Sequence, residues 1–86
     1  MNHFVYILKC KDKTFYTGYT NDLKKRVFTH NNLKTGARYT KARRPVVLVY
    51  SEKFRTKSKA MKRECEIKKM TRLQKISIIK NNYVII

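Results

Sequence analysis

Five side chains of this sequence have types and spacing suited to one reaction. Tyr6 and Tyr16 lie in neighbouring aromatic segments, and Arg26, His30 and Glu64 follow further along the chain. Hydrolysis of a phosphodiester needs a nucleophile, neutralisation of the charge on the phosphoryl oxygens and stabilisation of the leaving oxyanion. Tyrosine, arginine and a metal ion held by a carboxylate can supply these. Arg26 and His30 are four residues apart, so on a helix they face the same way.

Glu64 occupies a position at which a carboxylate needs an explanation. It lies between Ala60 and Ile67, at the spacing of the buried stripe of a helix, where an unpaired charge is costly. A magnesium (or manganese) ion would account for it, and with one carboxylate the ion would keep several waters. The alternative is a structural ion pair with one of three basic residues, namely Lys68, Arg26 and Lys41.

Each of these side chains also has an ordinary structural interpretation. The tyrosines could pack across a hairpin, Arg26 could be a solvated helix residue and His30 a surface histidine. If the site forms, positive charge from Arg26 and the metal ion is expected to favour ionised tyrosine and to lower its pKa from about 10.

Composition indicates an anionic partner. The chain has 86 residues, with 22 Lys and Arg against five Asp and Glu, which gives a net charge of +17. A charge this high on one small body favours nucleic acid as the partner and a monomeric state. We expect a single domain over residues 1–86. The sequence has no signal peptide and no apolar run long enough for a membrane span, which predicts a cytoplasmic protein without membrane contact. Cys10 and Cys65 lack metal or redox spacing and are expected in the core.

The first half of the chain predicts a hairpin, a helix and a loop. Residues 4–10 and 15–20 are rich in β-branched and aromatic types, with a polar three-residue turn between them. An odd loop makes Cys10 oppose Thr14, which places Tyr6 opposite Gly18 and Tyr16 on the same face, one diagonal away. A helix is expected over residues 22–31, followed by an exposed basic loop over 33–44.

The second half predicts a strand and two helices. Residues 46–50 form a continuous apolar run that suits a strand covered on both faces. Thr56 or Ser58 can cap a helix that runs to about residue 70, and Thr71 starts another over 72–80 through Leu73, Ile76 and Ile79. The apolar tail, residues 81–86, is expected to pack on the body. The fold class is α+β, a three-stranded antiparallel sheet flanked by helices in the order β-β-α-β-α-α.

These residues together resemble the GIY-YIG endonuclease domain. The resemblance is carried by Val5-Tyr6-Ile7, Tyr16-Thr17-Gly18 and the spaced Arg26, His30 and Glu64, over roughly residues 3–80. It is similar to the small stand-alone bacterial proteins with this domain. The sequence departs from the pattern where Val5 replaces a glycine and Thr17 an isoleucine.

The resemblance implies roles for individual residues. Tyr6 would lie at the attacking water with Tyr16 beside it, Arg26 on the phosphate and Glu64 on the metal. Lys9 matches a lysine that some members hold near the first tyrosine, where its charge would also favour ionised tyrosine, and the alternative for Lys9 is a general phosphate contact. His30 matches a histidine that other members hold near that tyrosine. Asn81 or Asn82 could match a late asparagine, and the sequence does not choose between them. From its charge, the basic loop predicts nucleic-acid contacts, at Lys34, Arg38, Tyr39, Lys41, Arg43 and Arg44.

Three functions remain open on the sequence. The first is a magnesium-dependent DNA endonuclease with little sequence specificity, which prefers certain DNA structures or is targeted by a partner protein. The second is a nucleic-acid-binding module with this fold and little or no turnover. The third is a basic protein bound to structured RNA, which a preference for A-form duplex would support. A binding module needs positive charge but has no use for Glu64 in a buried stripe, which favours the enzyme.

Overall fold

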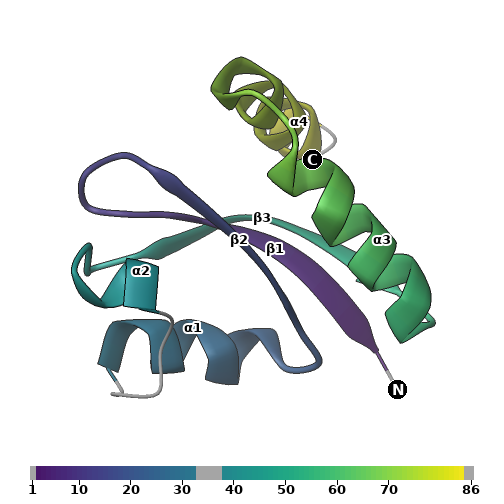
Figure 1. Cartoon of the computed structure of the whole chain (residues 1–86), viewed down its shortest axis with the longest axis horizontal. Coiled ribbons are helices and arrows are strands. Elements are labelled where there is room, and N and C mark those ends of the chain that lie inside the picture. The colour runs from purple at the N-terminus through teal and green to yellow at the C-terminus, as the bar shows by residue number, and fades with distance from the viewer. Residues whose placement is uncertain (1, 33–37, 85–86) are drawn as a thin grey trace.

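The computed structural model describes residues 2–32 and 38–84. Three strands, β1 (His3–Lys9), β2 (Phe15–Thr20) and β3 (Val47–Phe54), form one antiparallel sheet in the order β2-β1-β3. Figure 1 shows α1 (Leu23–Asn32) and the short α2 (Arg38–Lys41) on one face of the sheet, and α3 (Lys57–Lys68) and α4 (Arg72–Val84) on the other. The predicted α+β fold is confirmed. Helix α2 is an addition inside the predicted loop, whose residues 33–37 lie outside the described part.

The β1–β2 hairpin has the predicted register. Cys10 donates its N–H to the Thr14 carbonyl, and Tyr6 pairs with Gly18. Lys13 takes a positive φ of 67°, which closes the three-residue loop. Asp12 fixes the turn because its carboxylate accepts bonds from the Thr14 N–H at 3.1 Å and hydroxyl at 2.6 Å.

Strand β1 is buried on both faces, and its alternating side chains divide the core in two. Val5 and Ile7 pack towards α3 and α4 with Ala60 and Ile67, and all four are fully buried. Tyr6 and Leu8 point to the other face, against a cluster with Cys10, Val46, Leu23 and Val27. Residues three apart on β1 therefore lie on opposite faces of the sheet.

The prediction that the strand after the basic loop is covered on both faces is wrong. Strand β3 is an edge strand, and Val47 and Leu48 are 59% and 38% exposed. Its partner β1 takes the central position. A continuous apolar run cannot by itself distinguish a covered strand from an edge strand with exposed apolar residues.

The helix starts follow the capping residues of the sequence. Thr56, not Ser58, caps α3 and accepts the Lys59 N–H. Thr71 and Gln74 bond reciprocally at the start of α4, which runs beyond the predicted residue 80 to Val84. Of the tail, expected to pack on the body, Asn81 is exposed, and the side chains of residues 82–86 lie outside the described part.

Two expectations about helix faces are wrong. Leu73, expected on the apolar face of the last helix, is 78% exposed. Cys10 is buried as predicted, but Cys65 is exposed. Cys65 is five residues after buried Ala60 and two before buried Ile67, and neither interval brings it onto their face of α3.

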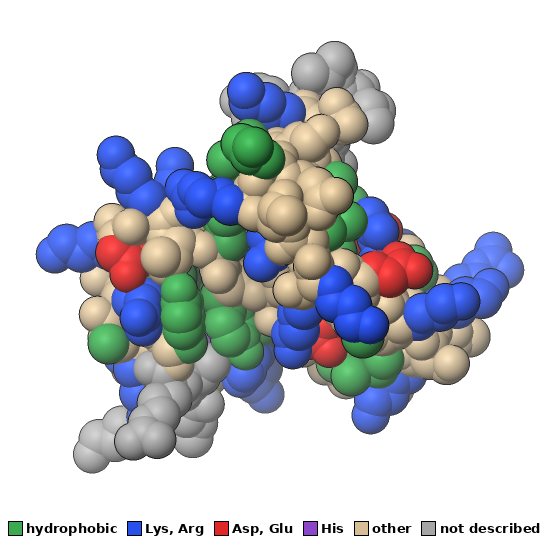
Figure 2. Space-filling view, turned by 45° about the horizontal axis from the view of Figure 1, so that its top comes forward, with side chains coloured by type: hydrophobic (Ala, Val, Ile, Leu, Met, Phe, Trp, Pro, Cys, Tyr) green, Lys and Arg blue, Asp and Glu red, His purple; other side chains and the backbone are tan. Residues whose placement is uncertain are grey.

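Basic side chains project on many sides of the molecule. Figure 2 shows Lys and Arg around the whole visible face, with few Asp and Glu among them.

No helix in residues 2–32 and 38–84 is long and apolar enough to cross a membrane.

Candidate active site

The Tyr6 hydroxyl is the centre of the site. The side chain is 1% exposed, and its oxygen lies 2.8 Å from Nε2 of His30 and 3.4 Å from Nε of Arg26, which donates to it. Gly18 on β2 makes room for it, since a Cβ there would lie 2.4 Å from the Tyr6 oxygen. The glycine of the second tripeptide is therefore needed for close approach.

His30 is held on both sides by hydroxyl groups. It is fully buried, and its Nδ1 lies 2.8 Å from Oγ1 of Thr40, itself fully buried. Burial first, and then the charges of Arg26 and Arg44, lower the pKa of His30 from 6.5 to about 4. At neutral pH the imidazole is therefore uncharged, with one nitrogen donating and the other accepting.

The expectation that the basic surroundings lower the pKa of Tyr6 is wrong for the protein alone. The pKa of Tyr6 is raised from 10 to about 12, first by burial and then by Tyr16 and Glu64, against the opposing hydrogen bond and charge of Arg26. Removing the phenol from water disfavours its charged form more than one arginine can offset. Tyr6 is therefore a hydroxyl, not a phenolate, at neutral pH.

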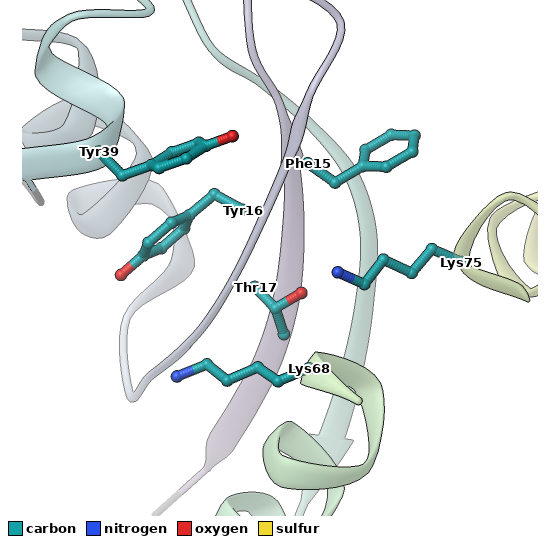
Figure 3. Close-up of a pocket in the computed structure, with 6 residues that line it drawn as sticks. All are labelled: Phe15, Tyr16, Thr17, Tyr39, Lys68 and Lys75. Carbon is teal, nitrogen blue, oxygen red and sulfur yellow. The ribbon is translucent and has the colours of Figure 1, made fainter. Parts of the chain in front are cut away.

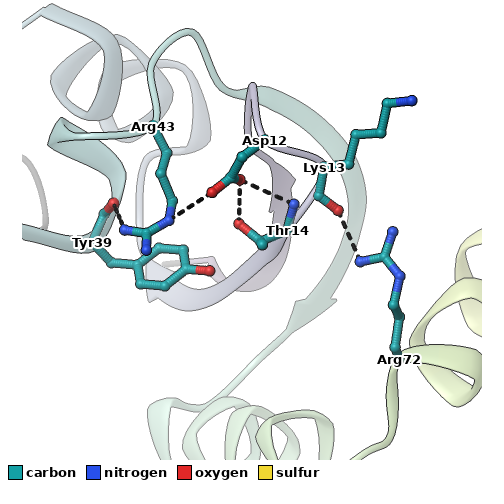
Figure 4. A network of polar contacts seen from close by, with 6 residues as sticks. All are labelled: Asp12, Lys13, Thr14, Tyr39, Arg43 and Arg72. Carbon is teal, nitrogen blue, oxygen red and sulfur yellow. Dashed lines mark hydrogen bonds and ion pairs between the residues drawn. The ribbon is translucent and has the colours of Figure 1, made fainter.

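A row of aromatic rings leads away from Tyr6. The Tyr16 ring lies 5.1 Å from the His30 ring and 6.1 Å from that of Tyr39, between centroids. The Arg43 guanidinium covers Tyr39 at 3.9 Å and donates to Asp12 in the hairpin turn at 2.9 Å, as Figure 4 shows. These contacts hold α2 against the hairpin and fix Tyr16 beside Tyr6 and His30.

Glu64 reaches the same site from α3. Its side chain is 13% exposed, and its charge acts on the Tyr6 hydroxyl. The Lys68 ammonium lies 3.5 Å from its carboxylate, so the ion pair that the sequence left open is present. This is longer than a charged hydrogen bond of about 2.7–2.9 Å. The Glu64 side chain is shielded but not buried, so the burial expected from the sequence is only partly met.

The residues present fit a magnesium ion that keeps most of its waters. No group of three His, Cys, Asp or Glu that could enclose a metal occurs in the described part of the chain. A single shielded carboxylate matches the preference of magnesium for one or two carboxylates together with water and substrate phosphate. Glu64 is the residue that would hold it.

Lys9 is not brought to the site. It follows Val5 and Ile7 at even spacing on β1, so it projects from the face opposite Tyr6. There it lines a cavity of about 280 Å³ together with Arg72 and Lys80 of α4. The structure gives no support for a place beside the first tyrosine.

The predicted nucleic-acid contacts separate into two groups. Tyr39 and Lys41 are exposed, and the Tyr39 ring also stacks on Tyr16 and Arg43. Arg43 is bonded to Asp12 and to the Tyr39 carbonyl, and Arg44 donates to the carbonyls of Thr29 and His30, so both arginines serve the local fold. Lys34 and the side chain of Arg38 lie outside the described part. Asn81 is exposed on α4, and the side chain of Asn82 is not described.

Sequence reasoning missed two residues of the site. Thr40 bonds His30 from α2, ten residues later in the chain, and no spacing rule relates them. Gly18 was placed opposite Tyr6 by the register, but its steric role depends on the direction of the phenol ring.

This chain belongs to the GIY-YIG family, a family of nucleases. The model of the GIY-YIG catalytic domain matches residues 2–77, which includes every strand and the candidate site. Tyr6, Tyr16, Gly18, Arg26, His30 and Glu64 all lie inside the matched region.

Similar proteins are small bacterial members of the same group. The UPF0213 protein SH2523 of Staphylococcus haemolyticus is 60% identical over 77 residues, which are 90% of this chain and 93% of that protein. The UPF0213 protein YazA of Bacillus subtilis is 60% identical over 86% of this chain and 74% of its own length.

Two solution NMR structures have the same fold. The protein EF2693 of E. faecalis has a TM-score of 0.67 at 43% identity, over 98% of this chain and 88% of that chain. The UPF0213 protein BH0048 of Bacillus halodurans has a TM-score of 0.61 at 44% identity, over 93% of this chain and 84% of that one.

Proposed function

We propose that this protein is a metal-dependent endonuclease that hydrolyses DNA phosphodiester bonds with little sequence specificity. The observation that carries the proposal is the buried Tyr6 hydroxyl, in contact with His30 and Arg26 and under the influence of Glu64. A binding module needs none of these buried polar contacts, because affinity for nucleic acid comes mainly from surface charge.

The proposed roles follow from the hydrogen bonds. With His30 neutral and its Nδ1–H donated to Thr40, Nε2 accepts the Tyr6 proton, and the Tyr6 oxygen accepts from Arg26 and can accept from a water. Tyr6 then takes a proton from the attacking water as it gives its own to His30. This relay avoids a free phenolate, which a pKa of about 12 makes scarce.

Arg26 and Glu64 complete the reaction. The remaining donors of the Arg26 guanidinium bind the phosphate, for which paired N–H groups are well suited. A magnesium or manganese ion on Glu64 supplies neutralisation of the phosphoryl charge and stabilisation of the leaving oxyanion when it is bound.

Little sequence specificity is proposed because the exposed basic side chains are suited to phosphates. Lysine and arginine side chains near the candidate site would bind the DNA backbone, which carries no base information. Selection would then come from DNA structure, such as a nick, flap or branch, or from a partner protein. We further propose a monomer of one domain in the cytoplasm, consistent with a net charge of +17 and two free cysteines.

The test compares cleavage by two tyrosine variants. Labelled nicked, flapped, branched and linear DNA is incubated with magnesium, manganese or EDTA and with wild type, Tyr6→Phe or Tyr19→Phe. Tyr19 is the matched control, since its hydroxyl bonds His3 instead of His30. The proposal expects metal-dependent cutting that Tyr6→Phe loses and Tyr19→Phe keeps. Tight binding without cutting by any form would support the binding module instead.

A further inference from the structure

A cavity lies directly beside the candidate active site. It has a volume of about 230 Å³ and is lined by six residues, namely Phe15, Tyr16, Thr17, Tyr39, Lys68 and Lys75. Tyr16 belongs both to this cavity and to the aromatic row beside His30, so the cavity adjoins the candidate site. The volume is below the roughly 300–1,000 Å³ of pockets for drug-sized molecules, which suits one small group.

The cavity has an unsatisfied polar group in its wall. Thr17 is 5% exposed, and its Oγ1 is buried without a hydrogen-bond partner in the described part of the chain. Figure 3 shows this hydroxyl directed to the side on which Lys75 lies. Buried hydroxyls are normally bonded, so this one calls for a ligand or a water. It also stands where the GIY-YIG motif has an isoleucine.

Two ammonium groups from different helices face the same cavity. Lys75 reaches from α4 towards Thr17, and Lys68 crosses below it from α3 (Figure 3). Lys75 is partly buried, and no Asp or Glu of the described chain forms an ion pair with it. Among residues 2–32 and 38–84, Lys68 forms an ion pair with Glu64 alone, at 3.5 Å. Two cations and a hydroxyl donor around one small space suit an oxyanion.

We propose that this cavity binds a backbone phosphate of the cleaved nucleic-acid strand, next to the phosphate at which that strand is cut. Lys75 and Lys68 would neutralise it, the Thr17 hydroxyl would donate to it, and Tyr16 and Tyr39 would form the opposite wall against the sugar. This inference rests on the proposed function, because it identifies the strand that passes Tyr6. It adds α4, which carries none of the contacts predicted from sequence, to the DNA-binding surface.

The test measures DNA binding in EDTA, so that no cleavage is needed. A fluorescein-labelled DNA flap is titrated with wild type, Lys75→Gln, Thr17→Val and Lys53→Gln at several salt concentrations. Lys53 is the matched control, an exposed lysine on β3 at the other edge of the sheet. Thr17→Val keeps the shape and removes only the unpartnered hydroxyl, so thermal unfolding should show an intact fold.

The two variants should have different signatures. Lys75→Gln should lower the slope of log affinity against log salt by about 0.7–0.9, the value for one phosphate contact. Thr17→Val should weaken binding by about fivefold with the slope unchanged, because its donor is neutral. The double variant should lose less binding free energy than the sum of the two single losses, since both groups would contact one phosphate. Lys53→Gln should match wild type.

Three results would overturn the proposal. The first is that Lys75→Gln has the same salt slope as Lys53→Gln, and the second is that Thr17→Val binds DNA as tightly as wild type. The third is that Lys75→Gln weakens binding of a polyglutamate peptide but not of DNA. The last would assign the cavity to acidic protein segments. Failure of wild type to cut any DNA would count against the proposed nuclease and leave this binding result standing.

Discussion

Acidification should destabilise this protein through His30, and the size of the effect follows from its burial. The folded state favours the neutral imidazole, because its pKa falls from 6.5 to about 4. The stabilisation is therefore complete above pH 6.5 and is lost as pH falls towards 4. Between pH 7 and pH 5 these pKa values give a loss of about 2 kcal/mol, out of about 3 kcal/mol for the whole shift.

The assay is urea unfolding of wild type, His30→Gln and His3→Gln at pH 7 and pH 5. His30→Gln removes the titrating group, so its free energy of unfolding should change about 2 kcal/mol less with pH than that of wild type. His3→Gln removes the other histidine, which is partly exposed on β1, and should keep the full dependence. An equal pH dependence in wild type and His30→Gln would refute the buried, neutral histidine on which the relay depends.

Three further predictions use the same contacts. Gly18→Ala places a methyl group 2.4 Å from the Tyr6 oxygen, so cleavage should fall by about tenfold or more, and wild-type rates would contradict the close approach. Ile67→Ala should lower the free energy of unfolding by about 2–5 kcal/mol and Leu73→Ala by under about 1 kcal/mol, since Ile67 is 0% and Leu73 78% exposed. Equal losses would contradict a core that contains Ile67 and excludes Leu73. DNA affinity measured by anisotropy should fall at least about a hundredfold from roughly 50 to 200 mM salt, and a flat dependence would exclude phosphate contacts.

The hairpin and the shared face of the tyrosines could be predicted because local rules determine them. An odd turn fixes Cys10 opposite Thr14, and the pairing of Tyr6 with Gly18 follows from strand alternation. Helical spacing likewise placed Arg26 and His30 on one face, and both contact the Tyr6 oxygen.

Other features depend on distant parts of the chain. The raised pKa of Tyr6 reflects burial by α1 and the sheet, which spacing does not report. Thr40 meets His30 only through the fold, and the sheet order decides that Val47 lies at an edge. The wrong placement of Lys9 could have been avoided from the sequence, because strand alternation puts Lys9 and Tyr6 on opposite faces. Only the family resemblance suggested that Lys9 lies near Tyr6.

We propose that Glu64 supports metal-dependent cleavage at Tyr6, and two carboxylates on one helix allow a matched test. Single-turnover cleavage of labelled DNA is measured with magnesium for wild type, Glu64→Ala and Glu66→Ala, with DNA binding in parallel. Glu66 is exposed and pairs with Arg63, away from the site. We predict that Glu64→Ala binds DNA but does not cut it, while Glu66→Ala cuts as wild type. Equal cleavage by both variants, or undiminished cleavage in EDTA, would contradict the account.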